Sequence, residues 1–182
     1  TIVVANQKGG VGKTTTALNL AASLSAASRK VLLIDLDSQG NSTTGIGKEK
    51  AEGKNSLVDV LIEKEQILDL IIQESGYKFD LIPASSDLIS AEIELSPLKN
   101  PTSILRSKLD QIKDKYDYTV IDCPPSLGML SVSALRAASK VLIPLQCEYY
   151  SLEGLAAMDK TIKEINQATG ENIEIDGILR TM

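Results

Sequence analysis

The sequence contains no histidine, no tryptophan, one phenylalanine and two cysteines, Cys123 and Cys147, which form no Cys-x-x-Cys pair. Common zinc sites and Cys/His nucleophiles require several of these side chains together, so the composition excludes both kinds of site. Two isolated cysteines at strand ends are more typical of buried apolar packing. Long apolar runs are also missing, since none approaches the roughly 18–20 residues of a membrane-spanning helix. We therefore expect a cytoplasmic protein.

The charge and length describe an ordinary globular chain. Its 182 residues carry 24 Asp and Glu against 19 Lys and Arg, a formal net charge of −5, and 43% of them are hydrophobic. This length predicts a single domain over residues 1–182. An acidic chain does not bind nucleic acid through its overall charge, although a local basic patch can still do so.

Short β-branched apolar runs alternate with helical patterns along the chain. Such continuous runs indicate parallel strands that are buried on both faces. The alternation predicts an α/β fold: an open, mostly parallel, doubly wound sheet with helices on both faces. The expected strands are Ile2–Ala5, Val31–Ile34, Phe79–Ile82, Tyr118–Ile121, Val141–Leu145 and Gly177–Leu179.

Apolar stripes with the spacing i, i+3, i+4, i+7 predict helices between these strands. The stripes are Ala17, Leu20, Ala21 and Leu24; Leu105, Leu109, Ile112 and Tyr116; and Leu155, Met158, Ile162 and Ile165. Residues 45–55, rich in glycine and in charges of both signs, predict a solvated loop. The chain stops just after a strand that a parallel sheet normally covers with a further helix, so we expect the C-terminal part of the domain to be missing.

A glycine-rich segment between the first strand and the first helix predicts a phosphate-binding P-loop, although the strict pattern has glycine in place of Gln7. Glycines let successive backbone N–H groups surround an anion, and the following helix adds its positive dipole. Lys13 would reach the β- and γ-phosphates, and the Thr14 hydroxyl would bind Mg²⁺. The expected nucleotide-binding residues are Lys8, Gly9, Gly10, Val11, Gly12, Lys13, Thr14 and Thr15.

Carboxylates follow two of the expected strands, at the edge where an open parallel sheet binds its ligands. Asp35 and Asp37 follow residues 31–34, and Asp122 follows residues 118–121. Asp122 is predicted to hold Mg²⁺ through water, because this ion keeps part of its hydration shell. Thr14, Asp37 and Asp122 are therefore the candidate metal-binding residues.

Lys8, directly before two glycines, makes the loop resemble the deviant Walker A motif of one branch of P-loop ATPases. Further segments in the same order extend the likeness over nearly the whole chain, which resembles the ParA/Soj type of chromosome- and plasmid-partitioning ATPase. These segments are Asn6-Gln7, Asp35–Asn41, Leu81–Ser85, Ile121–Ser126 and Pro144–Glu148 with Gly154. The chain departs from the family pattern at two positions: Ser38 stands where the family usually has proline, and Ser28 stands where a helix-ending glycine is common. Neither residue is expected to contact the phosphates.

The resemblance implies an ATPase with weak intrinsic activity that uses ATP and Mg²⁺ and forms a face-to-face homodimer when ATP binds. It implies that Lys8 contacts the nucleotide of the partner subunit, that Asp37 orients the attacking water and that Asp35 is more structural. Lys8, Lys13, Asp37 and Asp122 are thus the expected catalytic residues. The implied partners are non-specific double-stranded DNA, which would place the protein on the nucleoid, and a ParB-like centromere-binding protein that stimulates hydrolysis.

Three other functions remain open at this point. A MinD-like division-site ATPase would use the same switch on a membrane through a C-terminal amphipathic helix, whereas residues 37–41 favour the partitioning branch. A metal-cluster carrier would need paired thiolates, which the two isolated cysteines do not provide. A structural protein would require a P-loop that binds nothing.

Overall fold

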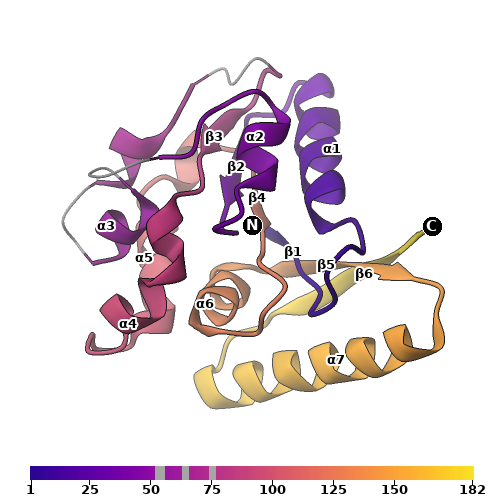
Figure 1. Ribbon diagram of the computed structural model, residues 1–182. Coiled ribbons are helices and arrows are strands. Elements are labelled where there is room, and N and C mark those ends of the chain that lie inside the picture. Colours follow the sequence, from indigo (N-terminus) through magenta and orange to yellow (C-terminus); the bar gives the residue numbers. More distant parts are fainter. Residues whose placement is uncertain (52–55, 63–65, 74–76) are drawn as a thin grey trace.

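A six-stranded sheet forms the centre of the molecule, with the strand order β3-β2-β4-β1-β5-β6 (Figure 1). The computed structural model describes residues 1–51, 56–62, 66–73 and 77–182. The strands are β1 (Ile2–Val4), β2 (Val31–Asp35), β3 (Asp80–Ile82), β4 (Tyr118–Asp122), β5 (Lys140–Gln146) and β6 (Glu174–Thr181). Every ladder that joins two of these strands is parallel, which confirms the expected sheet.

The central strands are buried on both faces because their side chains alternate between two layers of helices. All of β2 is buried. Leu32 and Ile34 belong to the larger apolar cluster, whereas Val31 and Leu33 belong to the smaller one. This division explains why the strand is continuously apolar in sequence instead of alternating with polar residues.

Helices cover both faces of the sheet, as the sequence predicts (Figure 1). Helix α1 (Lys13–Ala26) packs Ala17 and Ala21 into the smaller cluster. Helices α5 (Ile104–Asp110), α6 (Met129–Ala137) and α7 (Tyr149–Thr169) pack Leu105, Ala134 and Met158 into the larger one. In the part of the chain that the structure describes, no helix has the length and hydropathy to cross a membrane.

Shorter elements connect these layers. They are α2 (Asn41–Gly45), α3 (Leu57–Leu61) and α4 (Ala91–Leu95), with the 3₁₀ turns η1 (Ile67–Leu70), η2 (Ser86–Ile89), η3 (Pro101–Ser103) and η4 (Lys113–Lys115). The helix predicted through Tyr116 is therefore too long, because α5 ends at Asp110 and a 3₁₀ turn follows. The predicted loop 45–55 begins one residue too early, since Gly45 is the last residue of α2, and residues 52–55 lie outside the described residues.

The carboxyl ends of β1, β2 and β4 meet at one edge of the sheet. The register pairs Asp35 of β2 with Asp122 of β4, and Asp122 with Val4 of β1. The glycine loop leaves β1 directly after Val4 and leads into α1. The topology therefore brings the predicted P-loop and both groups of carboxylates to the same edge, as expected for an open parallel sheet.

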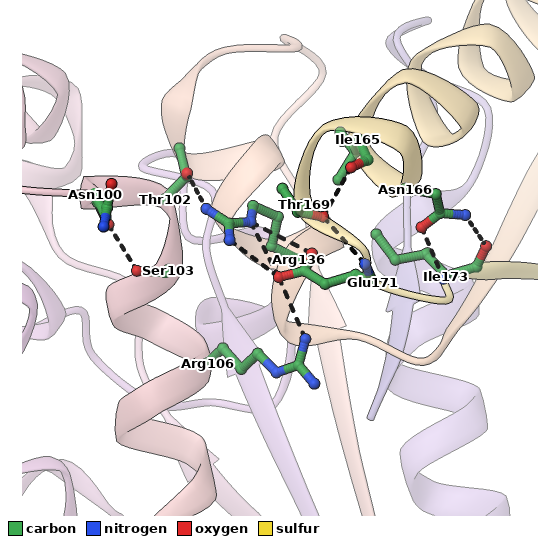
Figure 2. A network of polar contacts seen from close by, with 10 residues as sticks. All are labelled: Asn100, Thr102, Ser103, Arg106, Arg136, Ile165, Asn166, Thr169, Glu171 and Ile173. Atoms are coloured by element: carbon green, nitrogen blue, oxygen red, sulfur yellow. Dashed lines mark hydrogen bonds and ion pairs between the residues drawn. The ribbon is translucent and has the colours of Figure 1, made fainter.

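A polar network joins α5 and α6 to the turn between α7 and β6 (Figure 2). The Arg136 guanidinium donates from Nη2 to Glu171 Oε1 at 3.0 Å and from Nη1 to Thr102 Oγ1 at 2.7 Å. Arg106 adds a second ion pair to Glu171 at 3.3 Å. The side chains of Glu171 and Arg136 are only 11% and 17% exposed. The Glu171 carboxylate is therefore the main counter-charge of the nearly buried Arg136 guanidinium.

We expect Glu171→Ala to lower the free energy of unfolding by about 2 kcal/mol, because it leaves the Arg136 charge uncompensated. Chemical denaturation would measure the change. The matched control is Lys163→Ala, which breaks the pair with Asp159 on exposed side chains and should cost less than about 1 kcal/mol. Equal losses in the two variants would show that the network adds nothing to stability.

Candidate nucleotide-binding site

The glycine loop presents a row of unpaired backbone donors. Gly10 and Gly12 adopt positive φ angles of 73° and 88°, which only glycine adopts without strain. Among the described residues, the N–H groups of residues 9–15 donate to no acceptor, and the first bond of α1 runs from Thr16 N to Gly12 O at 2.9 Å. Seven successive free donors at the N-terminus of a 14-residue helix make an anion-binding nest.

Contacts with β5 and β6 hold this loop in place. Asn6 accepts from Lys8 N at 2.9 Å and donates to Pro144 O at 2.7 Å. Thr181 Oγ1 donates to Val11 O at 2.9 Å. Sequence reasoning missed Thr181, because a single threonine in a strand carries no signal of a contact with a loop 170 residues away.

Lys13 points its ammonium group at the loop. Its side chain is buried, and Nζ donates to Lys8 O at 3.0 Å, the one protein acceptor that it has among the described residues. Burial lowers the pKa of Lys13, while the nearby charges of Asp122 and Asp37 oppose this shift. The remaining ammonium donors are thus available for the β- and γ-phosphates of a nucleotide.

Helix α2 ties the two strand-end carboxylates together. Thr43 donates to Asp35 Oδ2 from both its backbone N and its Oγ1, each at 2.8 Å, and Ser42 Oγ donates to Asp122 Oδ2 at 2.7 Å. Thr43 Oγ1 also accepts from Ala84 N at 2.9 Å. Asp35 is fully buried within these bonds, which agrees with a structural role. Ser42 and Thr43 are absent from the sequence-based site, since the five-residue α2 shows no apolar periodicity.

Asp122 is a buried carboxylate with one free oxygen. Its Oδ1 has no hydrogen-bond partner of ordinary geometry among the described residues. Burial raises the pKa of Asp122 to about 6, the negative charges of Asp35 and Asp37 act in the same direction, and Ser42 and Thr14 oppose the shift. A buried carboxylate with one unpaired oxygen fits a hydrated Mg²⁺ ion, which takes one or two carboxylates and completes its shell with phosphates and water.

The described residues contain no group of three or more Asp, Glu or Cys side chains arranged to hold a metal. Cys123 is buried and Cys147 is exposed, and both are free. The expectation of apolar packing thus holds for Cys123 and is wrong for Cys147, and neither cysteine has the paired thiolate that a metal cluster needs.

Asp37 lies half-buried at the same edge. It leaves β2 in a tight turn, in which its N donates to Asp35 Oδ1 at 3.3 Å and its Oδ1 accepts from Gln39 N at 3.0 Å. Its charge acts on both Lys13 and Asp122. The structure therefore gathers Lys13, Thr14, Asp37 and Asp122 around the glycine loop.

Lys8 is held by a partner that the sequence did not suggest. Its ammonium forms an ion pair with Glu148, the residue that precedes α7, and the two side chains are 39% and 56% exposed. Glu148 lies 140 residues further along the chain. The ammonium of Lys8 is thus paired with the residue before α7, whereas its backbone O accepts from the buried Lys13.

The raised pKa of Asp122 predicts a pH dependence for the nucleotide-free protein. Between the unfolded value of 3.8 and the folded value of about 6, the folded chain holds a proton that the unfolded chain has lost. Stability should therefore fall as the pH rises through this interval, by up to roughly 3 kcal/mol. Urea denaturation from pH 4 to 7 should show a smaller fall in Asp122→Asn, because the contribution of Asp122 is removed and only that of other shifted groups, such as Asp35, remains. A fall of the same size in both proteins would contradict this origin.

The fold and this edge of the sheet define the class of protein. A glycine nest between β1 and α1, a buried lysine and strand-end carboxylates in a parallel sheet make a P-loop nucleoside triphosphatase fold. A family model described as an AAA domain matches residues 1–175.

Comparison with other sequences gives the family. Sporulation initiation inhibitor protein Soj of Bacillus subtilis is 45% identical over 181 residues, which cover 100% of this chain and 72% of that protein. Chromosome partitioning protein ParA of Myxococcus xanthus is 46% identical over 181 residues, with 100% and 64% covered. The chain belongs to the ParA/Soj family of partitioning ATPases, as the motifs predict.

Solved structures agree with this assignment. Cobyrinic acid a,c-diamide synthase from Mycobacterium smegmatis, with a bound ATP analogue and magnesium, superposes with a TM-score of 0.92 at 36% identity, over 98% of this chain and 73% of that one. A putative plasmid partition protein from Borrelia burgdorferi bound to AMPPNP gives 0.81 at 31% identity, over 98% and 72%. The first neighbour is consistent with ATP and Mg²⁺ as the expected cofactors, and the second is consistent with ATP.

Proposed function

We propose that this chain is an ATP-dependent switch that partitions a chromosome or plasmid. The observation that carries the proposal is the row of unpaired N–H groups at residues 9–15 beside buried Lys13 and Asp122. ATP binding would drive homodimer formation, the dimer would bind non-specific double-stranded DNA on the nucleoid, and a ParB-like partner would stimulate slow hydrolysis. The names of the relatives support a role in partitioning. DNA binding, stimulation by a ParB-like partner and formation of a homodimer extend that role in our proposal.

In this proposal the glycine loop and Lys13 bind the phosphates, while Thr14 and Asp122 hold Mg²⁺, with Asp37 near enough to join them through water. Mg²⁺, when bound, neutralises charge on the β- and γ-phosphates. Asp37 leaves β2 beside this position and can orient a water toward the γ-phosphate. Phosphoryl transfer needs mainly such positioning and charge stabilisation, so the lack of histidine is no obstacle.

The dimer depends on Lys8. In the single chain its ammonium is paired with Glu148, and both side chains are accessible. An exposed ion pair of this kind stabilises the chain by less than about 1 kcal/mol. The phosphates of the nucleotide bound to a partner subunit can therefore replace Glu148 as the counter-charge of Lys8. Lys8 would then stabilise charge on the transferring phosphoryl group, as an arginine finger does.

Gel filtration and DNA binding test this function together. With ATP or a slowly hydrolysed analogue, the full-length protein should elute as a dimer and bind DNA, and raising the salt concentration should weaken binding steeply. With ADP it should remain monomeric and leave DNA free. A protein that binds ATP but shows the same DNA affinity with both nucleotides would overturn the proposed switch.

Lys8→Ala should leave ATP affinity within a few-fold of the wild type, because Lys13 and the backbone donors remain. It should weaken ATP-dependent dimerisation and hydrolysis together by at least about tenfold, the scale of one lost charge-assisted contact. Equilibrium ATP titration, gel filtration and phosphate release would measure the three quantities. Lys163→Ala, on the exposed side of α7, is the matched control. Normal dimerisation in Lys8→Ala would remove this residue from the interface.

A further inference from the structure

A pocket lies at the edge of the sheet opposite to the glycine loop. Its volume is about 460 Å³, and its lining includes Lys30, Gln73, Lys78, Asp80, Lys115 and Tyr116. Lys30 directly precedes β2, Asp80 begins β3, and Tyr116 lies two residues before β4. Because β2 and β4 are each five residues long, roughly 15 Å of strand separates this pocket from Asp35 and Asp122. A ligand in the pocket would therefore leave the nucleotide site free.

Backbone contacts fix the walls of this pocket in the absence of any ligand. Lys30 N donates to Asp117 Oδ2 and Lys30 O accepts from Asp117 N, each at 2.8 Å, so the segments before β2 and β4 are joined. Ile72 and Leu81 exchange two backbone hydrogen bonds, at 2.8 and 3.0 Å, and the neighbouring Gln73 is thereby kept near the start of β3. Walls that are already ordered lose little conformational freedom when a ligand binds.

The backbone of Lys78 is held in an unusual conformation at the same edge. Its φ angle is 61°, in the left-handed region that a lysine rarely adopts. The hydroxyl of Ser25, a buried residue of α1, donates to Lys78 O and ties this residue to the helix. Residues in such conformations are frequent at ligand-binding sites, where the surrounding structure keeps them in place.

A tyrosine–aspartate pair forms part of the lining. Tyr116 Oη donates to Asp80 Oδ2 at 2.7 Å, and both residues are half-buried. Burial raises the pKa of Tyr116, and the hydrogen bond to Asp80 and the charge of Asp80 act in the same direction. Tyr116 therefore remains a donor that offsets part of the negative charge of this carboxylate.

The three lysines of the lining have no counter-charge of their own. Among the described residues, the ammonium groups of Lys30, Lys78 and Lys115 take part in no ion pair, and all three residues are exposed. Only two carboxylates, Asp80 and Asp114, line the pocket with them. A chain with a formal net charge of −5 therefore has an excess of cations at this pocket.

We infer that this pocket binds a small molecule that carries two or more phosphate groups. Lysine ammonium groups are compact charges suited to phosphate, and three of them from separate segments can contact two phosphates at once. The volume falls within the roughly 300–1,000 Å³ of small-molecule sites. Gln73 and Asp114 can accept hydrogen bonds from hydroxyl groups of the same ligand. The inference is independent of the proposed partitioning function.

Calorimetric titration of the full-length protein, saturated with Mg²⁺ and ADP, tests this site. The probes are fructose 1,6-bisphosphate and 2,3-bisphosphoglycerate at low salt concentration, and ADP keeps both out of the glycine loop. At least one probe should bind with a Kd of about 1 mM or lower. Inorganic phosphate should bind at least about tenfold more weakly, because it cannot contact all three lysines with two phosphate groups.

The triple variant Lys30→Gln, Lys78→Gln and Lys115→Gln should bind the probe at least about tenfold more weakly, since each ammonium supplies a charge-assisted hydrogen bond. These side chains are exposed, so the variant should fold, which thermal unfolding verifies. The matched control changes the net charge equally at exposed lysines outside the pocket: Lys99→Gln, Lys160→Gln and Lys163→Gln. It should bind the probe within about twofold of the wild type.

Asp114→Asn tests the same site with the opposite sign. It removes a negative charge from the lining, so probe affinity should rise by about two- to threefold. Weaker binding in this variant would contradict a site for phosphate groups.

Four further results would overturn the inference. Absence of binding by both probes would remove the site. Equal weakening in the two triple variants would show general attraction to the charge of the chain. Binding that occurs only without ADP would assign the probes to the glycine loop. Absence of probe binding together with a tenfold loss of DNA affinity in the variant of Lys30, Lys78 and Lys115 would assign these lysines to DNA.

Discussion

Lys13→Ala is expected to weaken ATP binding by at least about 10²-fold. The loss combines two or more charge-assisted hydrogen bonds to phosphate, each worth roughly 1.5–3 kcal/mol, with the loss of a buried cation beside the glycine loop. ATP-dependent dimerisation and hydrolysis should disappear with it. Calorimetric titration with Mg²⁺ and ATP measures the binding directly.

The control for Lys13→Ala is Lys108→Ala, which removes a lysine of similar burial from α5, outside the site. It should bind ATP as the wild type does. Thermal unfolding of both variants without nucleotide shows whether either change damages the fold. Unchanged ATP affinity in folded Lys13→Ala would refute the P-loop assignment.

Asp37→Ala is expected to lower the hydrolysis rate by roughly 10²-fold or more, the scale of a lost positioned catalytic group. ATP and Mg²⁺ should still bind, because the glycine loop, Lys13, Thr14 and Asp122 are intact. Lys8 is also intact, so the variant should dimerise. It should therefore remain an ATP-bound dimer on DNA when the ParB-like protein is added, whereas the wild type returns to monomer.

Asp37→Asn separates catalysis from local structure. The amide oxygen can still accept from Gln39 N, so the turn after β2 is preserved, but the carboxylate is lost. Hydrolysis should fall in both variants, as measured by phosphate release. If Asp37→Ala bound ATP but stayed monomeric in gel filtration, Asp37 would belong to the dimer interface and its role in orienting water would be withdrawn.

Contiguous features were predictable from the sequence. The glycine nest consists of successive residues between a strand and a helix, and local backbone geometry alone fixes its unpaired donors. The positions of Asp35, Asp37 and Asp122 at one edge also followed, because parallel strands direct all their carboxyl ends the same way. The continuous apolar runs similarly identified strands that are buried on both faces, as β2 is.

Only the tertiary structure decided how distant residues meet. Ser42 bonds to Asp122 across 80 residues, and Lys8 pairs with Glu148 across 140. The short polar α2 also depends on contacts between segments that are not neighbours in sequence. Local sequence patterns record the periodicity of one helix or strand, whereas these contacts depend on the order and register of several strands. The sequence therefore determined the kind of phosphate site, and the folded sheet determined which side chains complete and surround it.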